Sequence, residues 1–139
     1  MLQRRKPLKI LLVEDDVVDV MGFKRALRKS GLECSFEQCS NGKEALELLK
    51  TKQEHDVPIV VSDLKMPIMD GITLLQEIRK DPRLQKSPVF ILSSSDARQD
   101  VEMAYRSFAT GYVVKPGDSA GLSRFLGFLK QYGEFCESP

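Results

Sequence analysis

The feature that most constrains the fold is a short apolar run, Ile59–Val61, which is followed by a serine and then by Asp63. The run is β-branched throughout, with Pro58 before it and Pro67 beyond it. Such a run is typical of a strand buried on both faces of a parallel sheet. Asp63 then lies at the carboxyl end of a central strand, where the loops of an open α/β sheet part and ligands bind. Because an ionised carboxylate is costly to desolvate, we expect cationic partners near it.

The same pattern of a strand followed by a helix recurs along the chain. Apolar runs predict four further strands, at Lys9–Val13, Leu32–Cys39, Val89–Leu92 and Gly111–Val114. Apolar residues at helical spacing predict helices that begin near Val17, Asn41, Asp70, Val101 and Ser119. Five such units in series imply right-handed crossovers onto one sheet with helices on both faces. The predicted fold class is α/β, with a single doubly wound five-stranded parallel sheet.

Local signals mark several helix ends. Ser30-Gly31 is a stop signal, and Asn41 followed by Glu44 is a typical helix cap. Asp81-Pro82 closes the third helix, because a residue before proline is pushed out of helical dihedral angles. The fourth helix is marked by apolar residues at helical spacing, namely Val101, Ala104, Tyr105 and Phe108.

Composition limits the classes of partner. The 139 residues are 42% hydrophobic and 29% charged, as in an ordinary globular protein of one domain. With 21 basic and 20 acidic residues, the formal net charge is +1, so no overall field favours nucleic acid or a membrane surface. No apolar run approaches the roughly 20 residues of a membrane span. We expect one cytoplasmic domain over residues 1–139, with a core of about 9–130 and short tails, that binds neither nucleic acid nor membranes.

Chemically active side chains follow the predicted strands. Glu14 and Asp15 follow the first strand, Asp63 the third, Ser93 the fourth and Lys115 the fifth. If the sheet order is 2-1-3-4-5, these strand ends surround one crevice. Clustered carboxylates repel one another, and protonation or a divalent cation relieves that repulsion. Oxygen ligands suit Mg²⁺, and a carboxylate, a metal, a hydroxyl and an ammonium together can receive a phosphoryl group.

At these residues the sequence resembles the receiver domain of two-component response regulators, from Lys9 to about Lys130. Asp63 begins the family's Asp-x-x-Met-Pro-x-Met-Asp-Gly pattern. Tyr112 matches the switch aromatic, and Lys115-Pro116 matches the Lys-Pro pair whose peptide bond is usually cis in this family. The resemblance implies a flavodoxin-like fold with five helices and the strand order 2-1-3-4-5.

The resemblance also implies roles for the site. Asp63 would accept a phosphoryl group from the phosphohistidine of a sensor kinase. Asp15, Asp63 and the backbone carbonyl of Lys65 would hold Mg²⁺, with Glu14 acting through water on the metal.

Three further residues would act once the acyl phosphate forms. Lys115 would pair with one phosphoryl oxygen, Ser93 would move to hydrogen-bond another, and Tyr112 would rotate into the vacated space. These few new bonds would shift the conformational equilibrium of the domain toward a state in which one face is changed. That face is formed by the fourth helix, fifth strand and fifth helix.

The implied partners follow from the same resemblance. Stand-alone receivers that partner bacterial phytochromes have a stretch similar to Asp81–Pro88, so the kinase is expected to be a sensor histidine kinase of that kind. With no output domain expected, the signal would pass to a downstream protein or a phosphotransfer protein. Several receivers of that kind pair through the fourth helix, fifth strand and fifth helix, so two interpretations stay open for Phe128, Tyr132 and Phe135: a homodimer through this face, or ordinary packing. The only catalysis expected is self-phosphorylation and slow self-dephosphorylation.

Two other classes share parts of this pattern. A small Mg²⁺-dependent phosphatase or hydrolase also uses an aspartate nucleophile at a strand end, but it would need a second aspartate at position 65, where this chain has lysine. A flavodoxin-like cofactor module shares the fold. It would need a phosphate-binding loop after the first strand, where Glu14-Asp15-Asp16 would repel an anion.

Overall fold

Five parallel strands form the centre of the molecule. The computed structural model describes residues 7–136 and orders the strands β2-β1-β3-β4-β5, as predicted. Each strand pairs in parallel with its neighbour, and Val13 of β1 lies opposite Ser62 of β3. The strands are β1 Leu8–Val13, β2 Cys34–Cys39, β3 Ile59–Ser62, β4 Val89–Ser93 and β5 Gly111–Val114.

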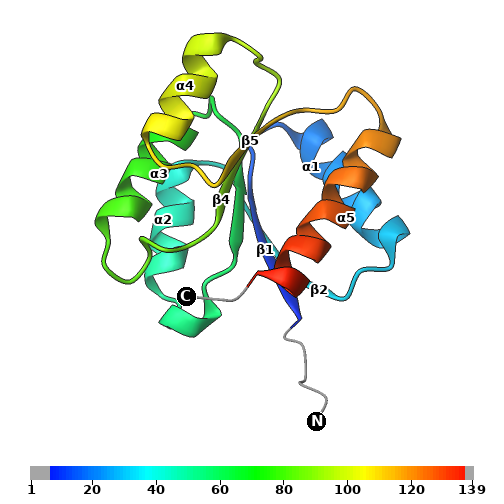
Figure 1. Cartoon of the computed structure of the whole chain (residues 1–139), viewed down its shortest axis with the longest axis horizontal. Helices are drawn as coiled ribbons and strands as arrows, with labels where there is room; N and C mark the ends of the chain where they lie inside the picture. Colours follow the sequence, from blue (N-terminus) through cyan, green and yellow to red (C-terminus); the bar gives the residue numbers. More distant parts are fainter. Residues whose placement is uncertain (1–6, 137–139) are drawn as a thin grey trace.

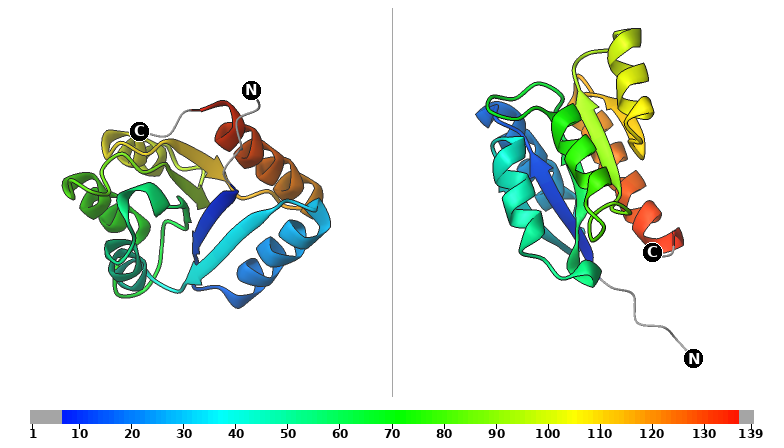
Figure 2. Two further views of the ribbon diagram at one scale, coloured as in Figure 1. Left: turned by 90° about the horizontal axis from the view of Figure 1, so that it is seen from below. Right: turned by 90° about the vertical axis from the view of Figure 1, so that its left-hand side faces the viewer.

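Helices cover both faces of the sheet, as expected for a doubly wound fold. Helices α1 and α5 pack together on one face, whereas α2, α3 and α4 lie on the other (Figure 1). Figure 2 shows the same two layers from two further directions. Among the described helices, none combines the length and apolar composition that a membrane span requires. The helices are α1 Val17–Ser30, α2 Gly42–Lys50, α3 Gly71–Lys80, α4 Arg98–Arg106 and α5 Ser119–Phe135, with a short 3₁₀ helix η1 at Glu54–Asp56.

The core is divided by the sheet into two apolar layers. Ile10 and Leu12 of β1 pack with Phe23 of α1 on one face. Leu11 and Val13 alternate with them and pack on the other face with the α2 and α3 side chains. Because side chains along a strand alternate between faces, a central strand covered on both sides must be apolar at consecutive positions.

The predicted helix ends are confirmed at three places. The Asn41 side chain accepts a hydrogen bond from the backbone N–H of Glu44 at 2.9 Å, which caps α2. Gly31 ends α1 in the left-handed conformation, with φ of 65°. The extended backbone of Asp81 ends α3 just before Pro82.

Three expectations about local structure are wrong. Strand β2 begins at Cys34 instead of Leu32. Helix α4 ends at Arg106 because Phe108 turns to φ of 67°, so the Phe108 side chain leaves the helical face and is 73% exposed. The peptide bond between Lys115 and Pro116 is trans, the form that an X-Pro bond favours by about 0.5–1 kcal/mol.

Gly71 allows α3 to begin directly against the residue that ends β3. A Cβ atom built on Gly71 would lie 2.1 Å from the backbone oxygen of Asp63. We therefore expect Gly71→Ala to lower the free energy of unfolding by about 3 kcal/mol, the upper part of the range for overpacking, when measured by urea denaturation.

Gly127→Ala in α5 is the matched control. No atom lies within 4 Å of the added Cβ, and alanine favours a helix over glycine by about 0.5–1 kcal/mol. This variant should be more stable than the wild type. Equal stability of the two variants would contradict the close approach at Gly71.

Candidate functional site

Backbone hydrogen bonds continue the strand pairing past the strand ends and place three side chains at one edge of the sheet. Glu14, Asp63 and Lys115 each donate the backbone N–H to a carbonyl of the neighbouring strand, at 2.7–2.9 Å. Their side chains therefore start from a rigid edge rather than from a free loop. The accepting carbonyls belong to Cys39, Val13 and Ser93, respectively.

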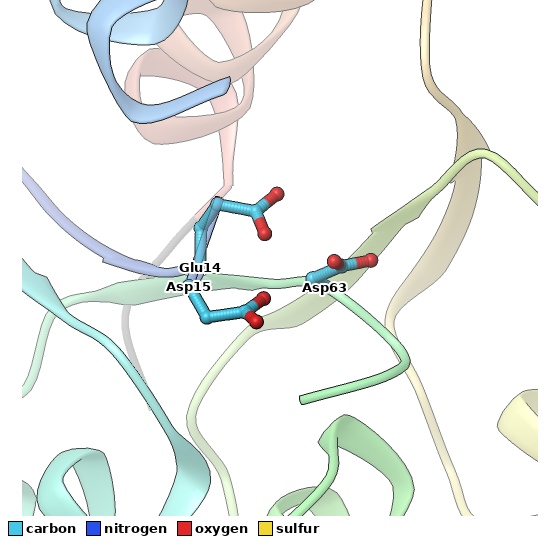
Figure 3. A group of neighbouring side chains, drawn as sticks. All are labelled: Glu14, Asp15 and Asp63. Atoms are coloured by element: carbon cyan, nitrogen blue, oxygen red, sulfur yellow. The ribbon is translucent and has the colours of Figure 1, made fainter. Parts of the chain in front are cut away.

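Three carboxylates converge at this edge (Figure 3). Carboxylate oxygens of Glu14, Asp15 and Asp63 lie within 4.8 Å of one another. Glu14 is buried, the Asp63 side chain is 15% exposed, and Asp15 faces solvent. Hard oxygen ligands on one side and open solvent on the other suit a cation that keeps some of its water. The cluster could hold a metal ion.

Burial changes the protonation of Glu14. Loss of hydration raises the pKa of this carboxyl group to about 7, and the nearby Asp63 carboxylate raises it as well. A hydrogen bond from Lys115 opposes the increase. The buried carboxyl group is thus balanced between its neutral and charged forms near neutral pH.

The Lys115 ammonium group lies among three carboxylates. Its Nζ atom donates to Glu14 Oε1 and Asp19 Oδ2, both at 2.7 Å, and lies 3.5 Å from Asp63 Oδ2. Burial lowers the pKa of Lys115, but the hydrogen bonds to Asp19 and Glu14 outweigh it and raise the pKa above its ordinary value. The ammonium therefore stays charged and faces the cluster.

Ser93 and Tyr112 both form hydrogen bonds with the backbone of Ser95. The buried Ser93 hydroxyl accepts a hydrogen bond from the N–H of Ser95 at 3.1 Å. The Tyr112 hydroxyl donates to the carbonyl oxygen of Ser95 at 2.7 Å. The Ser95 hydroxyl in turn donates to Asp100 of α4 at 2.6 Å. The loop after β4 thus links both side chains to the first turn of α4.

The structure adds Asp19 to the residues that the sequence singled out. Asp19 lies in the first turn of α1, four residues after Asp15, so its closeness in sequence to the acidic pair was a signal that could have identified it. Lys65 lies in the loop two residues beyond Asp63, with an exposed side chain. The predicted Glu14, Asp15, Asp63, Ser93 and Lys115 all lie at the carboxyl edge of the sheet.

Lys115→Met should raise the pKa of Glu14 further above about 7. The variant loses the hydrogen bond that lowers this pKa, while the burial that raises it remains. An NMR pH titration of the Glu14 side-chain carboxyl carbon, in buffer with a metal chelator, measures the change. Lys130→Met on the exposed face of α5 is the control and should have no effect. A lower Glu14 pKa in Lys115→Met would contradict the pairing.

Known proteins resemble this chain along most of its length. The family model of the response regulator receiver domain matches residues 10–126. The probable methanogenesis regulatory protein FilR2 of Methanothrix harundinacea (strain 6Ac) is 32% identical over 134 residues, which make up 94% of this chain and 86% of that protein. The chemotaxis protein CheY-3 of Vibrio cholerae is 35% identical over 121 residues, or 87% of this chain and 90% of that protein.

Two crystal structures are similar along almost the whole chain. The phosphorylated cyanobacterial phytochrome response regulator RcpA has a TM-score of 0.83 and 27% identity, covering 96% of this chain and 98% of that one. The Mn²⁺-bound form of the response regulator Rcp1 has a TM-score of 0.79 and 27% identity, covering 96% and 99%. The phosphatase alternative gains no support from these matches. The chain belongs to the response regulator receiver domain family and is a phospho-accepting module of two-component signalling.

Proposed function

We propose that Asp63 is the phosphoacceptor and takes the phosphoryl group from a phosphohistidine of a sensor histidine kinase. The observation that carries this proposal is the position of Asp63, whose carboxylate lies 3.5 Å from the Lys115 ammonium while its side chain stays partly exposed. Glu14 also contacts Lys115 but is buried, whereas Asp15 is exposed and has no ion pair with Lys115. In the transfer, the phosphorus–nitrogen bond to histidine breaks as a bond from an Asp63 oxygen to phosphorus forms.

The acidic cluster fits Mg²⁺ by its chemistry. Its donors are carboxylate oxygens within 4.8 Å of one another, the ligand type that Mg²⁺ prefers. Asp15, Asp63 and the backbone carbonyl of Lys65 would hold the ion, and Glu14 would reach it through water. When bound, the ion supplies positive charge that stabilises an incoming phosphoryl group. The similarity to Mn²⁺-bound Rcp1 supports a divalent cation in this chain.

The remaining site residues would stabilise and report the phosphorylated form. Lys115 already faces Asp63 and would pair with a phosphoryl oxygen. Ser93 would hydrogen-bond a second oxygen, for which its hydroxyl must turn away from the Ser95 N–H. Tyr112 would then rotate inward and give up its bond to the Ser95 carbonyl. These changes at Ser95 would act on the first turn of α4.

Receiver domains partner with sensor histidine kinases. We further propose that the kinase is a bacterial phytochrome and that residues 1–139 form a single receiver domain that works in the cytoplasm. The similarity to RcpA and the sequence of Asp81–Pro88 support this kinase class. Output would pass to a downstream protein or a phosphotransfer protein. Exposed side chains of α4, β5 and α5 support a homodimer through this face, namely Tyr105, Val114 and Phe128.

Asp63→Asn should abolish phosphorylation, because the amide cannot form the acyl phosphate. Intact mass spectrometry after incubation with acetyl phosphate and Mg²⁺ measures one added phosphate in the wild type and none in the variant. Leaving out Mg²⁺ should also prevent the adduct.

Asp96→Asn is the matched control, because Asp96 is an exposed carboxylate in the nearby loop after β4. It should be phosphorylated like the wild type. A phosphate adduct on Asp63→Asn would identify a different acceptor and reject the assignment.

Asp19→Asn should increase the ratio of phosphorylated to unphosphorylated protein. Asp19 shares the Lys115 ammonium, and its loss leaves this charge to pair with the phosphoryl group. A partly exposed ion pair is worth about 0.2–1 kcal/mol, so the increase should be at most about fivefold. The same mass measurement at steady state gives the ratio, with Glu47→Gln on the exposed face of α2 as the control. A decrease would mean that Asp19 aligns Lys115 instead of competing for it.

A further inference from the structure

A groove of about 940 Å³ lies between α3, α4 and the loop that follows α3. It is formed by the carboxyl-terminal parts of both helices, on the side of the sheet that carries α2, α3 and α4 (Figure 1). Each helix starts at the carboxyl edge of the sheet and runs back, so the groove lies at the end opposite the acidic cluster. It is therefore separate from the phosphorylation site.

The charge of this groove is all of one sign. Its lining includes no carboxylate. Within residues 7–136, neither Lys86 nor Arg106 has an ion pair or a side-chain hydrogen bond, and both are exposed. Lys80 of the lining lies 3.9 Å from Glu77, so the exposed cations that are left for a ligand are Lys86 and Arg106. The cations of the lining are Arg79, Lys80, Lys86 and Arg106.

An apolar pair lies among these cations. Met103 and Phe108 line the groove and are 40% and 73% exposed. Phe108 has φ of 67° at the position after the α4 C-cap, where glycine is the usual residue. A bulky side chain in this conformation is strained, and its ring lies in solvent instead of in the core. Phe108 is thus not explained by folding, because glycine would suit the backbone better.

The groove is held in shape by Arg79. Its Nε atom donates to the Phe108 carbonyl oxygen at 2.9 Å, and its Nη1 atom donates to the carbonyl oxygens of Gln85 and Ser87 at 3.0 and 2.7 Å. One guanidinium thus ties the end of α4 to the loop after α3. A preformed groove loses little conformational entropy on binding.

We propose that this groove binds an acidic segment of a partner protein. An apolar side chain of the segment packs on Met103 and Phe108, and its carboxylates face Lys86 and Arg106. Apolar contacts at the centre with complementary charges around them are typical of protein recognition. A peptide fits this arrangement better than double-stranded nucleic acid, because a duplex presents its phosphate backbone and would leave the exposed apolar pair without a partner. The binding surface does not depend on Asp63 or on the metal site.

The test is a binding titration with a synthetic peptide. The probe is a short fluorescein-labelled peptide with glutamates around a pair of leucines, and fluorescence anisotropy measures its binding to the full chain. We expect Lys86→Glu with Arg106→Glu to weaken binding at least about tenfold, the effect of losing charge complementarity at a small site. Lys24→Glu with Arg25→Glu on the exposed face of α1 makes the same charge change elsewhere and should have no effect.

Phe108→Gly separates binding from folding. Glycine relieves the strained conformation, so this variant should unfold at a higher urea concentration than the wild type while it binds the peptide more weakly. Circular dichroism checks that each charge variant is folded. Failure of the wild type to bind the peptide, or equal loss of binding in the α1 control, would overturn the proposal. Equal binding of a thymidine oligonucleotide with the same dependence on Lys86 and Arg106 would overturn it in favour of nucleic acid.

Discussion

The site depends on charge compensation by a single ammonium group at the carboxyl edge of the sheet. Lys115 contacts Glu14, Asp19 and Asp63, while Asp15 adds a further carboxylate to the same edge. One cation therefore faces four acidic groups. Burial of Glu14 reduces the negative charge, because it raises the pKa of that carboxyl group to about 7. The remaining negative charge would repel a phosphoryl group. A bound divalent cation would offset most of this negative charge and would thereby favour the approach of a phosphoryl group to this edge.

The strands and most helix ends could be predicted from the sequence, because buried parallel strands are continuously apolar and capping residues act locally. The strand order followed from the resemblance to the receiver family, since residue patterns alone leave it open. The predicted end of α4 was wrong for a physical reason: Phe108 has helical spacing, but its backbone turns out of the helix. Asp19 was missed because pairing with Lys115 joins two elements far apart in the chain, although its spacing from Asp15 was a usable signal.

The two ends of the sheet carry different kinds of interaction. The carboxyl edge gathers acidic groups at the ends of β1 and β3 and a lysine at the end of β5, where backbone hydrogen bonds restrict their positions. The opposite end carries the basic groove, whose shape depends on side-chain hydrogen bonds from Arg79. The first arrangement follows from sheet geometry, which favours ligand binding at strand ends. The second depends on individual side chains, so it can differ between chains that share this fold.

Ser93 and Tyr112 converge on the backbone of one residue, Ser95, and this has a consequence for the proposed switch. Ser95 receives a bond from Tyr112 through its carbonyl and gives one to Ser93 through its N–H, while its side chain holds Asp100. These three hydrogen bonds are what connects Ser93 and Tyr112 to α4 through Ser95. If Ser93 and Tyr112 act as proposed, a different residue at position 95 would change the strength of output for each phosphoryl group without altering the chemistry at Asp63.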